Sequence, residues 1–139
     1  MLKLQNISKS YNDKVVLNDI NLEINAGEIV SLLGPSGGGK TTLLNIILGL
    51  TKMDSGQIIF HDQDLSNVPM KNRGFNIVFQ DYALFPHLNA YENIVYGMKN
   101  NKNLVTADEL QEYIDFLELE PKKKKKIGEL SGGQKQRVA

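Results

Sequence analysis

The stretch Gly34-Pro-Ser-Gly-Gly-Gly-Lys40-Thr41-Thr42 decides the fold of this chain. It fits the pattern G-x-x-x-x-G-K-[ST], in which glycines turn successive backbone N–H groups inward and make a nest for phosphate oxygens. A nearly continuous apolar run at residues 29–33 precedes it and predicts a buried strand of a parallel sheet. Helix-compatible residues follow at 40–48, with Gly49 placed to end the helix. Because strand, loop and helix are the context that the motif requires, a chance glycine-rich turn is the weaker interpretation.

The residues of this phosphate loop (residues 34–42) have separate chemical roles. Lys40 is expected to reach the β- and γ-phosphates of a nucleotide, and the Thr41 hydroxyl to bind Mg²⁺. Thr42 is placed to donate toward the α-phosphate, and the following helix adds the positive end of its dipole. The sequence therefore predicts a site for ATP with Mg²⁺, formed by Gly34, Pro35, Ser36, Gly37, Gly38, Gly39, Lys40, Thr41 and Thr42.

The composition excludes several other classes of function. A length of 139 residues fits one domain, and 16 basic residues balance 16 acidic ones, so the bulk charge gives no case for nucleic acid. The chain has no cysteine, which excludes disulfides, thiolate zinc sites and a cysteine nucleophile. The longest apolar runs, residues 29–33 and 43–50, are too short to span a bilayer. A role at a membrane would therefore require a partner.

The rest of the sequence divides into a strand-rich part and a helical part. Alternating or continuous apolar residues predict strands at 2–4, 15–16, 20–24, 57–60 and 77–79, with a turn at 12–13. Capping-box spacing, in which an Asn or Thr precedes a Glu by three residues, predicts helix starts at Asn89 and Thr106. We expect residues 1–88 to form a nucleotide-binding core with a β subdomain. Residues 89–139 are expected to form a helical subdomain inside which the chain ends.

A second glycine-containing element, Leu130-Ser131-Gly132-Gly133-Gln134, also places backbone N–H groups at a helix start, but it has no lysine. Ser131 and Gln134 have capping-box spacing, and the two glycines fall in the first turn of the predicted helix. A helix start with a hydroxyl and exposed N–H groups can bind an anion. Alone, this pentapeptide would be an ordinary capped helix, but here it accompanies a phosphate loop.

The combination of the phosphate loop with LSGGQ resembles the ATP-binding subunit of ABC transporters, over all 139 residues. The resemblance implies an α/β fold: a P-loop NTPase core with an N-terminal antiparallel β subdomain and a helical subdomain, incomplete at the C-terminus. It also implies that Tyr11 stacks on adenine and that Val16 lies near the nucleotide. Gln80 matches the glutamine that contacts Mg²⁺ and the attacking water. Lys40 and Gln80 are then the catalytic candidates, and Thr41 and Gln80 the candidate Mg²⁺ ligands.

The resemblance also implies partners. Residues 81–88 and 92–94 are similar to bacterial import ATPases for polyamine, ferric iron, sulfate, thiamine or sugars, at the place where this family contacts its membrane subunits. The family implies a head-to-tail dimer, in which one copy closes over the γ-phosphate of the other through Ser131, Gly132, Gly133 and Gln134. Transmembrane permease subunits and, indirectly, a solute-binding protein are the further partners, with no nucleic acid. The location implied is peripheral, at the cytoplasmic face of the membrane. A soluble ABC-type ATPase of DNA repair or translation is the alternative, and residues 82–88 and 92–98 argue against it.

One part of the family pattern is missing from these 139 residues. In the family, the strand that carries the Mg²⁺-binding aspartate and the catalytic glutamate follows the LSGGQ helix, and no residue here is placed to replace them. The resemblance implies a transport-coupled ATPase for the parent protein. Because positioning of the base and the metal is central to phosphoryl transfer, the 139 residues alone are expected to hydrolyse ATP very poorly or not at all. We also expect apolar sheet edges left open where that strand would lie.

Five consecutive lysines at residues 122–126 have two interpretations. A basic cluster can bind nucleic acid or anionic lipid. The neutral overall charge and the adjacent Glu118 and Glu120 favour an ordinary solvated loop.

Overall fold

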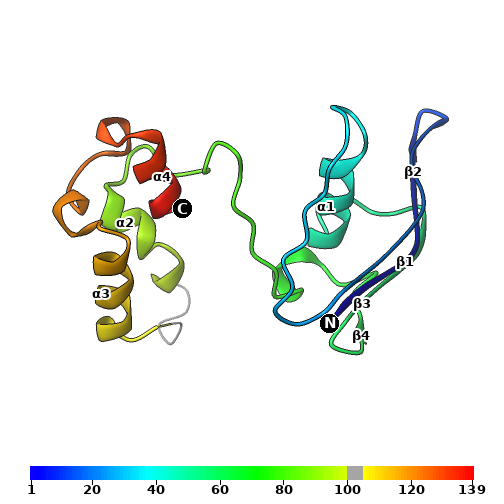
Figure 1. Cartoon of the computed structure of the whole chain (residues 1–139), viewed down its shortest axis with the longest axis horizontal. Coiled ribbons are helices and arrows are strands. Elements are labelled where there is room, and N and C mark those ends of the chain that lie inside the picture. Colours follow the sequence, from blue (N-terminus) through cyan, green and yellow to red (C-terminus); the bar gives the residue numbers. More distant parts are fainter. Residues whose placement is uncertain (100–104) are drawn as a thin grey trace. The chain divides into compact units, whose positions relative to one another are not determined.

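The structure is a computed structural model that describes residues 1–99 and 105–139. These residues form two compact units, Met1–Asn76 and Ile77–Ala139 (Figure 1). Each unit has its own cluster of buried apolar side chains. The contacts divide the chain at residues 76 and 77, whereas the functional division expected at residues 88 and 89 stays a prediction.

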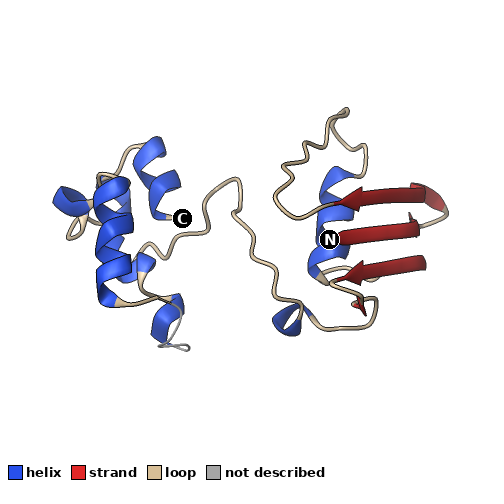
Figure 2. Ribbon diagram, turned by 60° about the horizontal axis from the view of Figure 1, so that its bottom comes forward, coloured by secondary structure: helices blue, strands red, loops and turns tan. Residues whose placement is uncertain are grey.

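The first unit is an antiparallel sheet beside one helix (Figure 2). Its strand order is β2-β1-β3-β4, with β1 at Leu2–Tyr11, β2 at Lys14–Ile24, β3 at Ser55–Phe60 and β4 at Gln63–Asp64. Helix α1 spans Lys40–Leu48, and a 3-10 turn, η1, spans Met70–Asn72. The core joins sheet and helix, because Leu4, Ile7 and Ile58 of the strands form one cluster with Leu43 and Ile46 of α1. Burial of such aliphatic side chains contributes roughly 1.5–3 kcal/mol each.

The hairpin between β1 and β2 confirms the predicted turn. Asn12 and Asp13 adopt φ angles of 47° and 61°, the left-handed conformation that tight hairpin turns require and that these residue types tolerate. The two strand pieces predicted at residues 15–16 and 20–24 are parts of the single strand β2.

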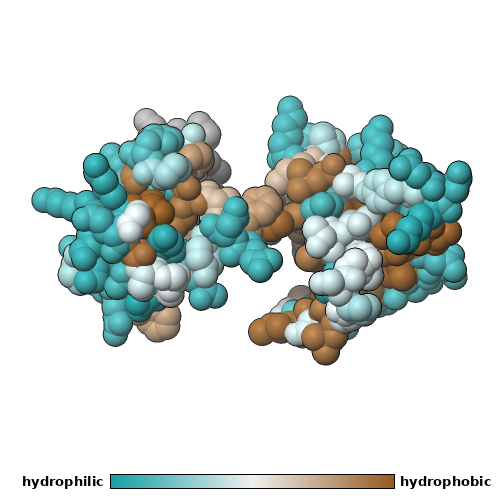
Figure 3. All heavy atoms as spheres, turned by 90° about the horizontal axis from the view of Figure 1, so that it is seen from above, coloured by the Kyte–Doolittle hydropathy of each residue, from teal (hydrophilic) through white to brown (hydrophobic). Residues whose placement is uncertain are grey.

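The strands predicted at residues 29–33 and 77–79 are absent, so both predictions were wrong. Every strand pairing among the described residues is antiparallel, and no described segment forms a ladder with residues 29–33. A strand exists only through hydrogen bonds to a neighbour, so an apolar run without one remains irregular. Ile29 and Leu33 are accordingly 98% and 93% exposed. Apolar side chains are visible at the surface of both units (Figure 3).

The second unit is helical. Helices α2, α3 and α4 span Ala90–Ile94, Ala107–Phe116 and Gly132–Val138, and 3-10 turns lie at Gly97–Lys99 (η2), Glu120–Lys122 (η3) and Ile127–Glu129 (η4). All three predicted capping boxes are formed, at Asn89, Thr106 and Ser131. The core consists of Ala90, Ile114, Leu119, Ile127, Leu130 and Val138.

The lysine segment (residues 122–126) is part of this helical unit. The carbonyls of Lys125 and Lys123 accept the first N–H groups of α2, from Ala90 at 2.9 Å and Tyr91 at 3.0 Å. The Lys123 ammonium also lies 2.7 Å from a Glu120 carboxylate oxygen. The segment thus has a structural role in covering the start of α2. None of the helices within residues 1–99 and 105–139 combines the length and the apolar character that crossing a bilayer requires.

Candidate phosphate-binding site

A bulge in β2 lies beside the phosphate loop. The pairing of β1 with β2 steps from Lys9 opposite Leu17 to Ser10 opposite Val15, which leaves Val16 without an opposite residue. Bulges of this kind redirect one residue out of the regular ladder and are frequent next to functional sites. Val16, which the family resemblance places near the nucleotide, thereby lines the same hollow as the glycines of the loop.

Gly39 holds the phosphate loop against this bulge. It is buried, with a φ angle of 83° that side chains other than hydrogen rarely allow. A Cβ atom there would lie 2.8 Å from Cδ2 of Leu17 and 2.9 Å from the carbonyl oxygen of Val16. Both the backbone angle and the packing therefore require glycine at the last position before α1.

Helix α1 begins in the loop without a side-chain cap. Its N-cap is Gly39, so no side chain of the described residues satisfies the N–H groups of the first turn. These N–H groups carry the positive end of the helix dipole. They lie at a hollow of about 120 Å³ lined by Val16, Gly37, Gly38, Gly39, Lys40, Thr41 and Thr42. An uncapped helix start facing a small hollow is the geometry of a phosphate site.

Lys40 places its charge within the loop. Its ammonium donates to the carbonyl oxygens of Gly34 at 2.8 Å and Pro35 at 2.7 Å. None of the ion pairs among the described residues includes Lys40, so no carboxylate neutralises its charge. Thr41 is exposed and Thr42 half-buried, which leaves the Thr41 hydroxyl accessible to a bound cation. The cation, the free N–H groups and the hydroxyl together fit the phosphates and the Mg²⁺ of a nucleotide.

The other predicted site residues are divided between the two units. Tyr11 ends β1 with 47% of its surface exposed, in the same unit as the phosphate loop. Gln80 lies in a turn of the second unit and is exposed. The LSGGQ element also lies in the second unit.

At the LSGGQ element, Ser131 and Gln134 cap the start of α4. The Ser131 hydroxyl accepts the N–H of Gln134 at 3.3 Å, and the Gln134 side-chain oxygen accepts the N–H of Ser131 at 3.0 Å. A Cβ atom added to Gly132 or Gly133 would meet no other atom within 4 Å. Packing within the described chain therefore does not explain these glycines, although glycine weakens a helix by about 1 kcal/mol relative to alanine.

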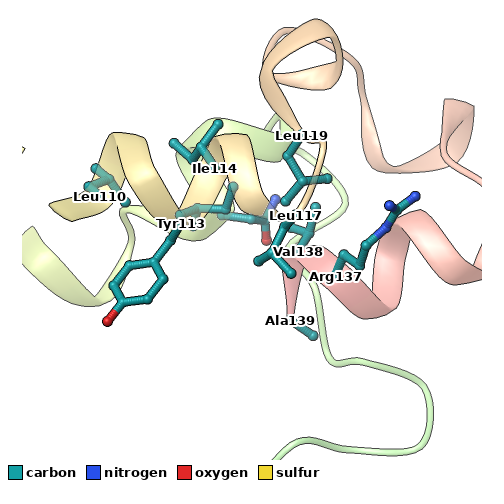
Figure 4. A pocket seen from close by; sticks show the side chains of 10 residues that line it. Leu110, Tyr113, Ile114, Leu117, Leu119, Arg137, Val138 and Ala139 are labelled. Atoms are coloured by element: carbon teal, nitrogen blue, oxygen red, sulfur yellow. The ribbon is translucent and has the colours of Figure 1, made fainter. Parts of the chain in front are cut away.

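A larger hollow of about 320 Å³ lies in the second unit along α3 and the end of α4 (Figure 4). Its lining is mostly aliphatic, including Leu110, Ile114, Leu117 and Val138, with the Arg137 side chain at one end. Arg137 is already paired with a Glu118 oxygen at 3.2 Å. Among the described residues that line this hollow, the cation Arg137 is therefore already ion-paired, unlike Lys40 of the phosphate loop.

Sequence reasoning missed Arg73, which secures the opposite end of α1. Only 6% of Arg73 is exposed, and its guanidinium donates to the carbonyls of Ile46 at 2.9 Å, Ile47 at 2.8 Å and Val68 at 2.7 Å. Burial lowers the pKa of the Arg73 guanidinium below its ordinary value. One signal was available: α1 has no basic residue in its last turn, although helix ends favour a cation there.

The chain belongs to the ABC transporter family, whose sequence model matches residues 17–139. Among curated proteins, the spermidine/putrescine import ATP-binding protein PotA of Mycoplasma capricolum subsp. capricolum is 48% identical over 141 residues. The protein of the same name from Spiroplasma citri is 50% identical over 141 residues. Each match covers 100% of this chain and 40% of the relative, so the chain spans less than half the length of these proteins.

Solved structures confirm the fold class. The dimeric, post-hydrolysis structure of the ATP-binding cassette MJ0796 with ADP and Pi has a TM-score of 0.80 and 35% identity, covering 99% of this chain and 66% of that one. The ABC transporter cassette MJ1267 has a TM-score of 0.82 and 28% identity, covering 99% and 62%. The antiparallel sheet, the phosphate-loop helix and the helical part thus form the fold of an ABC ATPase cassette, although the strands expected at residues 29–33 and 77–79 are absent.

Proposed function

We propose that this chain binds MgATP as the nucleotide-binding part of the motor subunit of an ABC import system. The observation that carries the proposal is the uncapped start of α1, where free N–H groups, the Lys40 ammonium and the Thr41 hydroxyl meet at one hollow. Lys40 would hold the β- and γ-phosphates, and Thr41 together with Gln80 would hold Mg²⁺. Tyr11 would stack on the adenine, with Val16 beside it. Mg²⁺ supplies charge neutralisation between the phosphates, while the chain orients them.

We propose the same division of labour along the chain as the family resemblance implies. Residues 1–88 contain the sheet, the phosphate loop and α1, and would be the nucleotide-binding core. Residues 89–139 contain α2, α3 and α4, and would be the helical part that presents LSGGQ.

A head-to-tail dimer is the assembly that we propose for ATP binding. Gly132 and Gly133 have open space around them, which supports a role in close approach to a second molecule rather than in packing of their own helix. In that dimer, residues 131–134 of one copy would donate to the γ-phosphate held by the phosphate loop of the other. The dimeric state of the similar cassette MJ0796 also supports this arrangement.

Sedimentation velocity tests the proposed assembly. We expect the wild-type chain to sediment as a monomer without nucleotide and to form dimers when MgATP is added. Gly133→Leu should abolish the dimer without weakening MgATP binding to the monomer, because the added side chain would occupy the approach to the partner copy. A dimer that forms equally well without nucleotide, or with Gly133→Leu, would contradict the proposed role.

We propose an import system of the polyamine class as the setting of this motor. The support is the 48–50% identity to import proteins named for spermidine and putrescine. The chain would then lie peripherally at the cytoplasmic face of the membrane, bound to permease subunits and indirectly to a solute-binding protein. Affinity purification of the whole parent protein from membrane extracts tests this: permease subunits are expected. Recovery of ribosomes or DNA instead would favour a soluble ABC-type ATPase.

A further inference from the structure

We infer that Lys9, held by Asp54, is a positioning residue that orients the Tyr11 ring to stack on the purine base of the bound nucleotide. The inference rests on the proposed MgATP site and assigns a base-selective function to a lysine outside the phosphate loop. It concerns the first unit only, in which β1 carries both Lys9 and Tyr11.

The side chain of Lys9 is fixed by a carboxylate clamp. One Asp54 carboxylate oxygen accepts the Lys9 ammonium at 2.6 Å, and the other accepts the N–H of Ser10 at 2.7 Å. The N–H of Asp54 in turn donates to the carbonyl of Ser8 at 2.9 Å, so Asp54 is attached to β1 at three successive residues. Only 15% of the Lys9 side chain is exposed. Because of these contacts, the Lys9 side chain has much less freedom to rotate than that of an ordinary surface lysine.

The restricted ammonium lies over the ring of Tyr11. Its nitrogen is 5.2 Å from the ring centroid, within the range of a cation–π contact. Tyr11 still has 47% of its surface exposed, so the ring retains area on which a base can stack. A ring already held in orientation loses less conformational freedom when the base binds, and so binds more tightly.

The clamp is also adjacent to the phosphate-binding part of the site. Lys9 and Ser10 lie opposite the two residues that flank the Val16 bulge. Val16 in turn lines the hollow of the phosphate loop, and its carbonyl faces Gly39. Tyr11 thus lies on β1, and the phosphate loop packs against Val16 of the neighbouring strand β2, so one site can bind a base and its phosphates.

The test compares a ligand that has a base with one that lacks it. Isothermal titration calorimetry measures the Kd of MgATP and of Mg-tripolyphosphate for the 139-residue chain and its variants. Lys9→Met should weaken MgATP binding about two- to fivefold, the value of an exposed cation–π contact. It should leave tripolyphosphate binding unchanged, and Lys9→Arg should retain the wild-type Kd for MgATP. Lys3→Met is the matched control, because Lys3 is another ion-paired lysine of β1, 3.3 Å from Glu23.

Each possible outcome is decisive. Equal losses for both ligands in Lys9→Met would show a general structural role and overturn the inference. An unchanged Kd for MgATP in Lys9→Met, with a loss of roughly fivefold or more in Tyr11→Leu, would overturn the role of Lys9 but leave stacking on Tyr11 intact. No effect of Tyr11→Leu would overturn stacking itself. Failure of the wild-type chain to bind either ligand would overturn the proposed function.

Discussion

At the residue scale, Gly39 connects the candidate site to the sheet. Gly39→Ala should lower the free energy of unfolding by about 2 kcal/mol or more, because a left-handed φ angle costs roughly 1–2 kcal/mol and the Cβ atom also overlaps the bulge. The overlap is with Leu17 Cδ2 at 2.8 Å and the Val16 carbonyl at 2.9 Å. Urea denaturation gives the measurement.

Gly27 provides the matched control for this substitution. Its φ angle is 80°, close to that of Gly39, but a Cβ atom there would meet nothing within 4 Å. Gly27→Ala should therefore lower the free energy of unfolding only by the cost of the left-handed φ angle. Equal losses in the two variants would contradict the tight packing of Gly39 against β2.

The hydrogen bonds of Asp54 should stabilise the folded chain at neutral pH and lose this effect in acid. The hydrogen bond from the Lys9 ammonium, and then that from the Ser10 N–H, hold the pKa of Asp54 below its ordinary value of 3.8. A carboxyl whose pKa is depressed by folding stabilises the native state above its unfolded pKa, and this contribution is lost as the pH falls through the folded pKa. The difference in free energy of unfolding between wild type and Asp54→Asn should therefore shrink as the pH falls below 3.8. If the difference in free energy of unfolding between wild type and Asp54→Asn is the same at neutral and acidic pH, the stabilising role of the Asp54 hydrogen bonds is contradicted.

At the scale of elements, α1 depends on Arg73 at its C-terminal end. Arg73→Met removes the charged donor from the carbonyls of Ile46 and Ile47 and leaves them buried without it. Because hydrogen bonds to charged groups contribute about 1.5–3 kcal/mol, we expect a loss of about 2–4 kcal/mol in the free energy of unfolding.

Lys3→Met is the control for Arg73→Met in the same unit. Lys3 is 33% exposed and pairs with Glu23, which is 51% exposed, so its loss should cost less than about 1 kcal/mol. Urea denaturation of both variants tests the expectation. Similar small losses in both would show that Arg73 does not secure α1.

Elements fixed by local chemistry could be predicted from the sequence, and elements fixed by distant partners could not. The start of α3 at Thr106 follows from a hydroxyl and a carboxylate three residues apart, which need only each other. Gly49 ends α1 for a similarly local reason, with a φ angle of 82°. Residues 29–33 have the apolar character of a buried strand, but a strand also needs a neighbour, which a local pattern does not supply.

The same distinction applies to the candidate site. The phosphate loop could be found because its glycines, lysine and threonine lie within one continuous motif. The contact of Gly39 with the Val16 bulge joins residues far apart in sequence, as does the pairing of Lys9 with Asp54. No spacing rule relates these positions, so only the folded chain brings them together.

At the scale of the whole molecule, we predict that these 139 residues bind ATP far better than they hydrolyse it. We expect this because the family resemblance places the Mg²⁺-binding aspartate and the catalytic glutamate on a strand after the LSGGQ helix, whereas the described strands β1 to β4 all precede that helix. Release of inorganic phosphate from MgATP, measured at saturating nucleotide, should stay near the rate of a Lys40→Ala control. Turnover of about 1–100 s⁻¹, the range typical of kinases, would contradict the prediction.

The central claim is that the phosphate loop and the start of α1 hold the nucleotide. Backbone amide NMR during a titration with MgATP tests it most directly, because each N–H group of the loop reports its own environment. We predict saturable shifts concentrated at residues 37–42, which are lost in Lys40→Ala while the signals of the sheet remain in place. Saturable binding that shifts other residues and leaves 37–42 unchanged, or no binding at all, would contradict the account.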